Sequence, residues 1–337
     1  MNAPTFHFDF ERPHSLVALT DLLTTLSTQG RDYALAAGAT DLMPQIKHGL
    51  KTPHVMVSLN GLGELSRIEA CADGGVVIGA LTRLADLAAH PLIGQRYPTL
   101  AHAALRVASP PIRQRATLGG NLLVDNRCIY INQSAINRAA HSPCFKAGGD
   151  VCHLVKSAVL GKLPQCQARF VSDTAPVLLL LDAELHLLSA RGERRLPLAD
   201  FYCDDGMQRH LLATDEVLAA IALPAAVGLR IDYDKLAIRR VLDFPSLGIA
   251  LGVREDGRGK LRELSLAMTG IGTHPGQWRF TAADHDGAPS MLAAACARAR
   301  GFASTYDQDF FPRDYRKRMI DVFIRKAAAR LGGVAWT

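Results

Sequence analysis

The sequence is poor in aromatic residues and has no long uninterrupted apolar run. Aromatic side chains make up 6% of the 337 residues, and no set of rings forms a platform on which nucleic-acid bases would stack. The longest apolar stretch, residues 175–188, is interrupted by Asp182 and Glu184 and is too short to span a membrane. The first fifteen residues lack the basic and apolar regions of a signal peptide. We therefore expect a cytoplasmic protein that binds neither nucleic acid nor a membrane.

Acidic residues are fewer than basic ones: the chain has 32 Asp and Glu and 38 Lys and Arg, which gives a formal net charge of +6. The basic residues are spread along the chain, with one cluster at residues 313–331. There Tyr315, Met319, Val322 and Phe323 recur at helical spacing, so we interpret the charges as the solvent-facing side of an amphipathic helix. The basic charge nevertheless keeps one alternative function open, that of a zinc-stabilised nucleic-acid-binding protein.

Hydrophobic content of 48% and charged content of 21% are typical of a globular protein, and the length predicts two or three domains. The pattern predicts a helix between Ser15 and Gly30 and strands at 32–38 and 54–59. A hairpin at 67–81, two helices at 82–90 and 99–109, and a strand pair over 175–201 should follow. Two long segments, 229–256 and 261–272, predict antiparallel strands, and two C-terminal helices should follow them.

Two short segments are rich in glycine and small residues. "AAGATDL" at residues 36–42 and "ATLGGNLL" at 116–123 each place small residues where backbone amides can approach a phosphate at a helix N-terminus. Neither is a Rossmann fingerprint or a P-loop. Taken alone, small residues at the end of a strand more often reflect tight backbone packing.

Cysteine is scarce, yet four of the seven lie between residues 127 and 166: Cys128, Cys144, Cys152 and Cys166. The odd total and the expected reducing compartment argue against disulfides. The steps of 16, 8 and 14 residues contain no pair two to four residues apart, as zinc sites usually have, and the common ferredoxin run is absent. Spacing alone leaves iron–sulfur, zinc and unliganded thiols open, with His153 as a ligand in the zinc case. We expect the distant Cys71, Cys203 and Cys296 to be buried or incidental thiols.

The order of four segments carries a resemblance to a known family. "AAGATDL", "ASPPIRQRATLGGNLL", "VSDTAPVLLLLDAEL" and "KLAIRRVLDFPSLGIAL" together resemble the FAD-binding subunit of molybdenum hydroxylases, the xanthine dehydrogenase and carbon monoxide dehydrogenase family. The resemblance runs from about residue 5 to 330. It implies an α+β fold: a two-lobed FAD-binding domain (1–60 and 61–225) followed by a small C-terminal α+β domain (226–337).

The resemblance also implies which residues hold FAD, with the two glycine turns on its pyrophosphate and no catalytic acid, base or nucleophile on this chain. The implied FAD-binding residues are Ala36, Ala37, Gly38, Ala39, Thr40, Asp41, Leu42, Val107, Thr117, Gly119, Gly120, Asn121, Asp173 and Lys235. Ala39 stands where the family usually has a second glycine. We expect its φ to stay below zero, because a Cβ is costly otherwise.

The link from Asp125 to Phe170 is about forty residues longer than in most relatives, and a long structureless loop needs something to organise it. One branch of the family, the 4-hydroxybenzoyl-CoA reductase β subunit, carries an insert that residues 125–170 of this chain resemble. By that resemblance Cys128, Cys144, Cys152 and Cys166 hold a 4Fe–4S cluster, although the gap before Cys166 is longer here.

The function implied by the resemblance is electron transfer. Electrons from a ferredoxin-like donor would pass through the 4Fe–4S cluster and FAD toward a 2Fe–2S small subunit and a molybdenum-cofactor large subunit, in a heterohexamer that dehydroxylates 4-hydroxybenzoyl-CoA. The alternative within the family is a hydroxylase subunit with outward electron flow.

Overall fold

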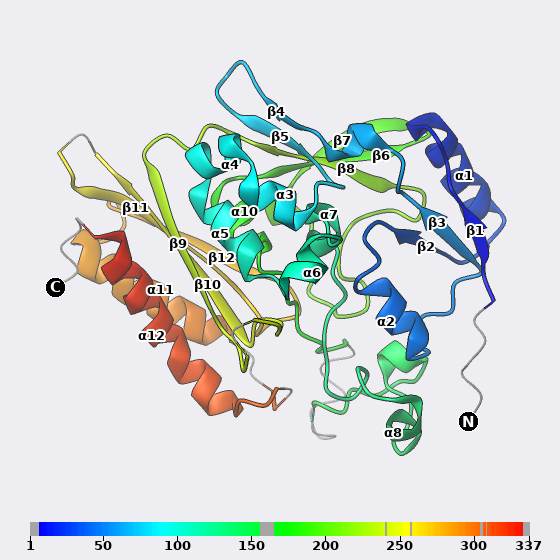
Figure 1. Ribbon diagram of the computed structural model, residues 1–337. Coiled ribbons are helices and arrows are strands. Elements are labelled where there is room, and N and C mark those ends of the chain that lie inside the picture. The colour runs from blue at the N-terminus through cyan, green and yellow to red at the C-terminus, as the bar shows by residue number, and fades with distance from the viewer. Residues whose placement is uncertain are drawn as a thin grey trace.

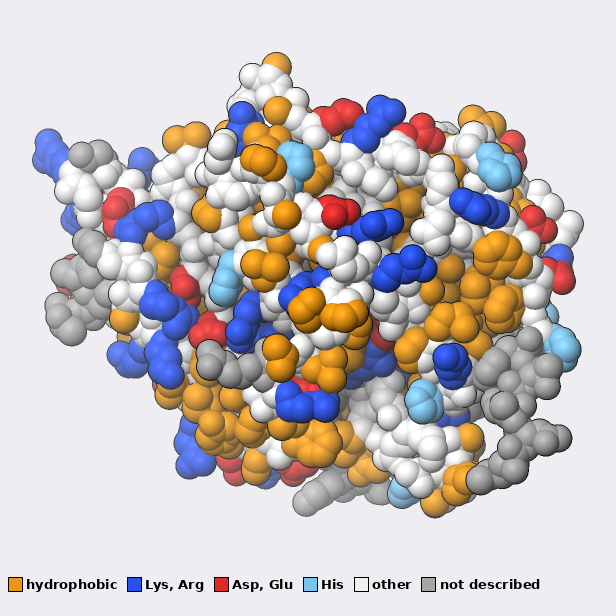
Figure 2. All heavy atoms as spheres, viewed as in Figure 1, with side chains coloured by type: hydrophobic (Ala, Val, Ile, Leu, Met, Phe, Trp, Pro, Cys, Tyr) orange, Lys and Arg blue, Asp and Glu red, His pale blue; other side chains and the backbone are white. Residues whose placement is uncertain are grey.

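The computed structural model describes residues 7–155, 165–239, 241–256, 258–303, 306–307 and 309–332. Helices and three separate sheets build a mixed α and β architecture, as predicted (Figure 1). No helix in the described ranges is both long and apolar enough to cross a bilayer. In the view of Figure 2, basic side chains are spread over the surface, several of them over the C-terminal helices.

The first lobe is a three-stranded parallel sheet in the order β1-β3-β2 with two helices. Its elements are β1 (Asp9–Glu11), α1 (Leu16–Thr28), β2 (Tyr33–Ala36), α2 (Leu42–Lys47) and β3 (Val55–Ser58). The helix predicted between Ser15 and Gly30 is confirmed. Ser15 Oγ accepts a hydrogen bond from Ala18 N at 3.1 Å, and Gly30 takes a left-handed φ of 62° after the helix ends. Leucines of α1 pack on this sheet.

The second lobe is a five-stranded antiparallel sheet in the order β4-β5-β8-β6-β7, covered by short helices. The predicted hairpin is β4-β5, and the two predicted helices are α3 and α5, with α4 between them. The elements are η1 (Gly63–Ser66), β4 (Ile68–Ala70), β5 (Val76–Gly79), α3 (Leu84–Ala89), α4 (Pro91–Arg96), α5 (Pro98–Arg106), α6 (Pro110–Arg113), α7 (Leu118–Leu122), β6 (Glu184–Ser189), β7 (Gly192–Pro197), η3 (Leu198–Asp200) and β8 (Val217–Leu223).

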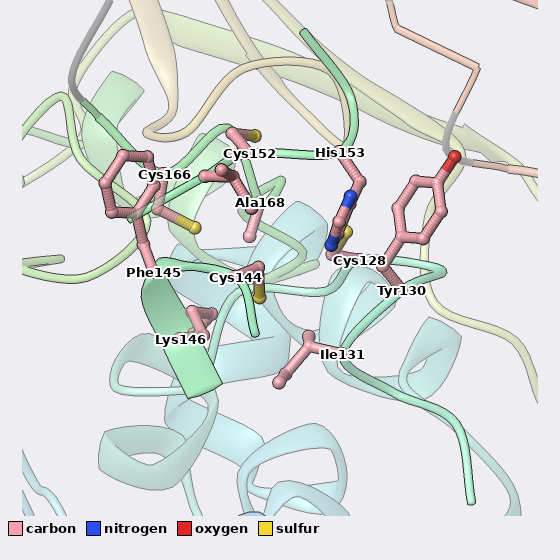
Figure 3. A pocket seen from close by; sticks show the side chains of 11 residues that line it. Cys128, Tyr130, Ile131, Cys144, Phe145, Lys146, Cys152, His153, Cys166 and Ala168 are labelled. Atoms are coloured by element: carbon pink, nitrogen blue, oxygen red, sulfur yellow. The ribbon is translucent and has the colours of Figure 1, made fainter. Parts of the chain in front are cut away.

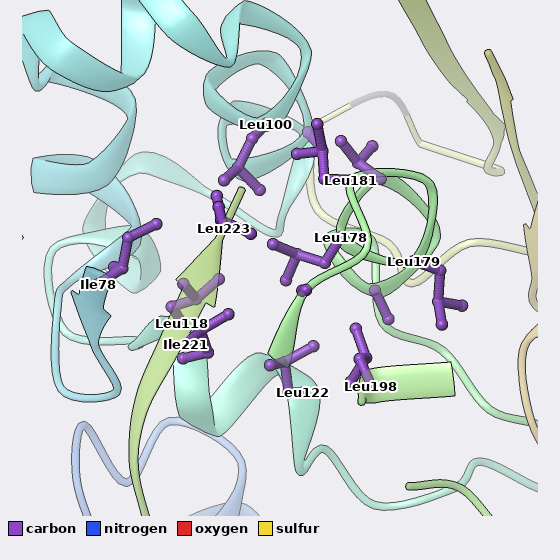
Figure 4. Packing of buried hydrophobic residues seen from close by; sticks show 14 of the residues in the cluster. Ile78, Leu100, Leu118, Leu122, Leu178, Leu179, Leu181, Leu198, Ile221 and Leu223 are labelled. Atoms are coloured by element: carbon purple, nitrogen blue, oxygen red, sulfur yellow. The ribbon is translucent and has the colours of Figure 1, made fainter. Parts of the chain in front are cut away.

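The prediction of a strand at the start of 175–201 is wrong. Residues Ala175–Leu180 form helix α10, with Pro176 in its first turn and all six residues buried. A short apolar run that is buried on every side has no periodicity to distinguish a helix from a strand. Leu178 and Leu179 of this helix point in different directions into the apolar packing (Figure 4). The strand pair itself is confirmed as β6 and β7.

The C-terminal part is a four-stranded antiparallel sheet in the order β12-β11-β10-β9, with two long helices against one face (Figure 1). Strand β12 was not predicted. Helix α10 contacts β10 and β11 on the other side, so it lies between the second lobe and this sheet. The elements are β9 (Leu229–Leu236), β10 (Leu247–Glu255), β11 (Leu261–Thr269), β12 (Gly276–Thr281), α11 (Gly287–Phe302) and α12 (Arg313–Leu331).

Helix α12 differs from its predicted orientation. Its buried face carries Ile320, Phe323 and Ile324, whereas Val322 is 37% exposed. Arg316, expected on the solvent side, is 0% exposed, and its guanidinium donates to the carbonyl oxygen of Tyr306. Burial of this arginine is compensated by backbone carbonyl oxygens that accept hydrogen bonds from its guanidinium.

Candidate functional site

The two glycine turns lie directly against one another. The turn after β2 places Gly38 so close to the second turn that a Cβ added there would lie 1.8 Å from the carbonyl oxygen of Arg115. Only glycine permits this backbone approach. Asn60 Nδ2 donates to the carbonyl oxygen of Ala37 at 3.2 Å and holds the first turn from the side of β3. The sequence had predicted both turns, and the structure brings them together.

Ala39 is a correction to the sequence-based expectation. Its φ is +54°, in the left-handed region, rather than below zero. An L-residue there costs on the order of 1–2 kcal/mol, so a glycine would suit the same backbone. The turn therefore keeps its shape despite the side chain, and Met43 N donates to the carbonyl oxygen of Ala39 at 3.1 Å as α2 begins.

Thr40, Asp41 and Leu42 complete the first turn, and all three are half-buried. Asp41 does not cap α2 with its side chain. Its carboxylate accepts a hydrogen bond from Gln45 Nε2 at 2.6 Å and forms an ion pair with Arg127. Arg127 directly precedes Cys128, so this pair links the first turn to the insert.

The second turn begins α7, where Thr117 Oγ1 accepts a hydrogen bond from Gly120 N at 3.1 Å. The two glycines of this turn have different environments. Gly119 is buried, and a Cβ there would lie 2.8 Å from that of Ala80. Gly120 is exposed, and a Cβ there would meet only Thr117 Oγ1, at 3.0 Å. Gly119 serves close packing, and Gly120 is the glycine open to a ligand.

Asn121, the next residue, fixes the start of the segment at 172–174. Its Oδ1 accepts hydrogen bonds from Ser172 Oγ at 2.8 Å and from Thr174 Oγ1 at 2.7 Å. Val107, at the end of α5, belongs to the core of the second lobe. Sequence reasoning missed Ser172 and Thr174 as partners of Asn121; their signal was the hydroxyl pair flanking Asp173.

Asp173 and Lys235 form a buried ion pair that joins the second lobe to β9. Lys235 Nζ donates to Asp173 Oδ2 at 3.0 Å and to the carbonyl oxygen of Asp243 at 2.9 Å. Tyr233 Oη donates to the other carboxylate oxygen at 2.7 Å. Burial raises the pKa of Asp173, against the opposing effect of Lys235. Asp173 and Lys235, two of the residues that the resemblance assigned to FAD, thus lie together.

The four clustered cysteines line one small cavity that is partly open to solvent (Figure 3). They come from loops around α8 (Ala135–Ala139) and η2 (Phe145–Ala147) and from the loop before Phe170. Residues 156–164 of the predicted insert lie outside the described residues. Cys166 N donates to Asp205 Oδ1 at 3.2 Å, and Gly206 N donates to the carbonyl oxygen of Cys166 at 2.8 Å.

The four thiols line one cavity without converging on a single point. No three His, Cys, Asp or Glu side chains of the described part of the chain converge closely enough to hold a single metal ion. Burial raises the pKa of Cys128, and it raises the pKa of Cys166 to about 12. A metal ligand is a thiolate, so metal binding at these two sulfurs would displace their protons.

The other candidate ligands are placed differently. His153 lines the same cavity, but its Nε2 lies 2.8 Å from the carbonyl oxygen of Ser142. Cys71 and Cys203 are half-buried and Cys296 is buried, and none of the three lines the cavity.

Comparisons with known proteins identify the fold and the family. Residues 6–226 match the family model for the FAD binding domain in molybdopterin dehydrogenase. The chain is 36% identical to the aldehyde oxidoreductase FAD-binding subunit of Escherichia coli, over 74% of this chain and 77% of that protein. It is 27% identical to the carbon monoxide dehydrogenase medium chain of Afipia carboxidovorans, over 96% of each.

Solved structures agree with these matches. The reconstituted CO dehydrogenase from Oligotropha carboxidovorans superimposes with a TM-score of 0.75 at 25% identity, covering 99% of this chain and 100% of that chain. The carbon monoxide dehydrogenase from Hydrogenophaga pseudoflava gives 0.73 at 24% identity over 99% of this chain and 100% of that chain, which shows the fold.

The lobed fold and the paired glycine turns define the class of this protein: an oxidoreductase subunit that binds FAD. The chain belongs to the family of FAD-binding medium subunits of molybdenum hydroxylase-type complexes.

Proposed function

We propose that this subunit transfers electrons with two bound groups, FAD at its paired glycine turns and one 4Fe–4S cluster on Cys128, Cys144, Cys152 and Cys166. The observation that carries the proposal is the meeting of four cysteines, distant in sequence, around a single cavity. A set of four thiolates suits iron–sulfur clusters and zinc alike. The cluster is favoured because each of its four irons takes one sulfur, so the sulfurs stand farther apart than around one ion.

The insert supports the proposal because it has no hydrophobic core of its own. Residues 127–155 contribute to none of the four hydrophobic clusters formed by the described part of the chain. Such a segment cannot bury enough apolar surface to offset its loss of conformational entropy. Metal binding would supply the missing folding free energy.

The chain's own residues then have distinct tasks. Gly38 lets the two turns approach each other, Gly120 leaves the second turn open to a ligand, and Asn121 holds the 172–174 segment beside that turn. The buried Lys235–Asp173 pair keeps an ammonium group fixed within the protein, where the resemblance places the flavin. When bound, FAD and the cluster supply the capacity to accept and release electrons. No residue here is proposed as a catalytic acid, base or nucleophile.

For partners we propose a molybdenum-cofactor large subunit and a 2Fe–2S small subunit in a heterohexamer, located in the cytoplasm. Support comes from the relative named as the medium chain of carbon monoxide dehydrogenase, a name that implies other chains. A ferredoxin-like protein is proposed as the external electron carrier.

Two directions of electron flow are proposed for testing. The cysteine insert supports the inward direction, with reductive dehydroxylation of 4-hydroxybenzoyl-CoA on the complex. The outward direction, with a substrate oxidised on the molybdenum subunit, is favoured by the 36% identical relative, which is named as part of an aldehyde oxidoreductase. That identity makes the outward direction the better supported of the two.

Metal and flavin analysis of the anaerobically purified protein, with the chains that co-purify, tests the proposal. We expect one FAD for each copy of this chain. We also expect about four irons and four acid-labile sulfides per copy beyond those held by any 2Fe–2S chain. Bound zinc without iron would reject the cluster, and absence of flavin after incubation with FAD would contradict the flavin assignment. Turnover assays with aromatic aldehydes and with 4-hydroxybenzoyl-CoA plus a reduced donor decide the direction.

A further inference from the structure

A cluster of charged side chains joins the insert to the two lobes beside the cysteine cavity. Its centre is Asp125, which follows the second glycine turn. Lys146 Nζ, from the insert, lies 2.6 Å from Asp125 Oδ1, and Arg209 Nε lies 3.2 Å from the same oxygen. Lys51, from the first lobe, is near enough that its charge lowers the pKa of Asp125. Lys146 and Arg209 thus share one carboxylate, and these three paired groups carry a net charge of +1.

Little of this charge is exposed to water. The side chain of Lys146 is 11% exposed, and those of Asp125 and Arg209 are each 18% exposed. Burial acts to raise the pKa of Asp125, but Lys146 and Arg209 outweigh it and keep the pKa below its usual range. The carboxylate is therefore ionised at neutral pH, and the ion pair is screened less than a surface pair.

Lys146 is the member of the group that reaches the cysteines. It lines the cavity together with all four of them, and it stands two residues after Cys144 (Figure 3). Asp125 lies three residues before Cys128. The excess positive charge is therefore adjacent to the place where four thiolates would gather.

Charge next to an iron–sulfur cluster changes how readily the cluster accepts an electron. Net charge and solvent exposure are among the factors that set the reduction potential of such clusters. A cation held close by in a poorly solvated place stabilises the reduced form, which carries one more negative charge. A simpler role is also compatible with the contacts, because Lys146 ties the insert to Asp125 and to the carbonyl oxygen of Asn126 at 3.3 Å.

We propose that Lys146 is a positioning residue whose ammonium charge raises the reduction potential of the metal cluster on the four cysteines, while Asp125 moderates that effect. The inference rests on the 4Fe–4S assignment proposed above. It adds that this chain tunes the cluster with a charge drawn from the insert itself.

The test is an anaerobic redox titration of the protein with its co-purifying chains, with the cluster signal followed by electron paramagnetic resonance. Lys146→Met removes the charge and keeps most of the apolar stem, whereas Lys146→Arg keeps the charge. Asp125→Asn removes the negative charge and retains an oxygen that accepts from Lys146. We expect the potential to fall in Lys146→Met, to stay near wild type in Lys146→Arg, and to rise in Asp125→Asn.

Opposite shifts in the two charge-removing variants distinguish tuning from tethering, because loss of a tether loosens the insert in both. Shifts in the same direction, or no shift in Lys146→Met, would overturn the inference. If Lys146→Met loses its iron, Asp125→Asn decides alone, and an unchanged potential there overturns it. If the wild type contains no cluster iron, the assignment itself fails, whereas unmoved potentials with full iron remove only the role of Lys146.

Discussion

At the scale of single residues, Ala39 shows a turn whose shape is kept despite an unfavourable side chain. Replacing it by glycine should raise the free energy of unfolding by up to about 1 kcal/mol, because its φ of +54° suits a residue without a Cβ. Urea unfolding of the purified protein measures the change. Ala37→Gly, in the same turn but without a positive φ, is the matched control and should lower stability. A loss of stability in both variants would contradict the explanation.

The two adjacent glycines of the second turn should respond differently to substitution. Gly120→Val should lower the flavin content with a small change in melting temperature, because Gly120 is exposed. Gly119→Ala should lower the melting temperature first, since its Cβ would lie 2.9 Å from the carbonyl oxygen of Ala80. Flavin absorbance and thermal unfolding of each variant give both quantities. Equal flavin loss with equal destabilisation would reject the distinction.

His210 makes stability depend on pH below neutrality. Burial, reinforced by the charge of Arg209, lowers its pKa to about 4. The unfolded chain therefore binds a proton that the folded chain does not between about pH 6.5 and 4, so stability falls as pH drops through that window.

His210→Phe should remove up to about 3 kcal/mol of this pH dependence, because phenylalanine does not titrate. It keeps a ring for stacking on Phe201, whose centroid lies 5.2 Å from that of His210. Urea midpoints from pH 7 to 4 for both proteins measure the effect. Parallel curves would mean that His210 does not contribute.

At the scale of secondary-structure elements, α10 holds two sheets together. Leu178 is 0% exposed, so Leu178→Ala should cost about 2–5 kcal/mol through lost burial and the cavity it leaves. Leu105→Ala, at a side chain that is 52% exposed, is the control and should change stability little. Chemical denaturation measures both, and similar effects would count against the central place of α10.

Sequence patterns predicted the elements that have a polar face or a cap, and failed where these were missing. Helix α1 was predicted from Ser15 and its leucine spacing, and the β4-β5 hairpin from its glycine turn. Helix α10 was misassigned because it is buried on all sides. The buried face of α12 was predicted wrongly because Arg316 donates to the carbonyl oxygens of Gly270 and Tyr306, which the pattern of the helix itself does not reveal.

The candidate site was predicted in the same uneven way. The glycine turns and the cysteines could be named from local residue types together with a family resemblance. The sign of φ at Ala39, the different burial of Gly119 and Gly120, and the pairing of Asp173 with Lys235 depend on how distant segments pack. No local pattern contains that information.

At the scale of the whole molecule, the insert is attached by polar contacts and the proposed metal rather than by a core. It contacts the first lobe through Arg127 with Asp41 and through Arg138, which donates to the carbonyl oxygen of His48 at 2.7 Å. Removing iron with an anaerobic chelator should therefore make residues 127–155 more sensitive to protease, while the flavin stays bound. Limited proteolysis with mass spectrometry locates the cuts. Cleavage spread evenly over the molecule would contradict this picture.

The position of α10 also has a consequence for how the protein folds during its synthesis. The ribosome releases the chain from its N-terminus, so α10 emerges before β10 and β11, which cover one of its sides. Until Thr269 has been synthesised, β11 is incomplete, and the side of α10 that packs against β10 and β11 stays exposed on the nascent chain. The family model ends at residue 226, but a chain truncated at that residue would lack β10 and β11 and would leave this surface of α10 exposed to solvent. A chaperone that binds short apolar segments would therefore have a target at residues 175–180 until the C-terminal sheet has formed.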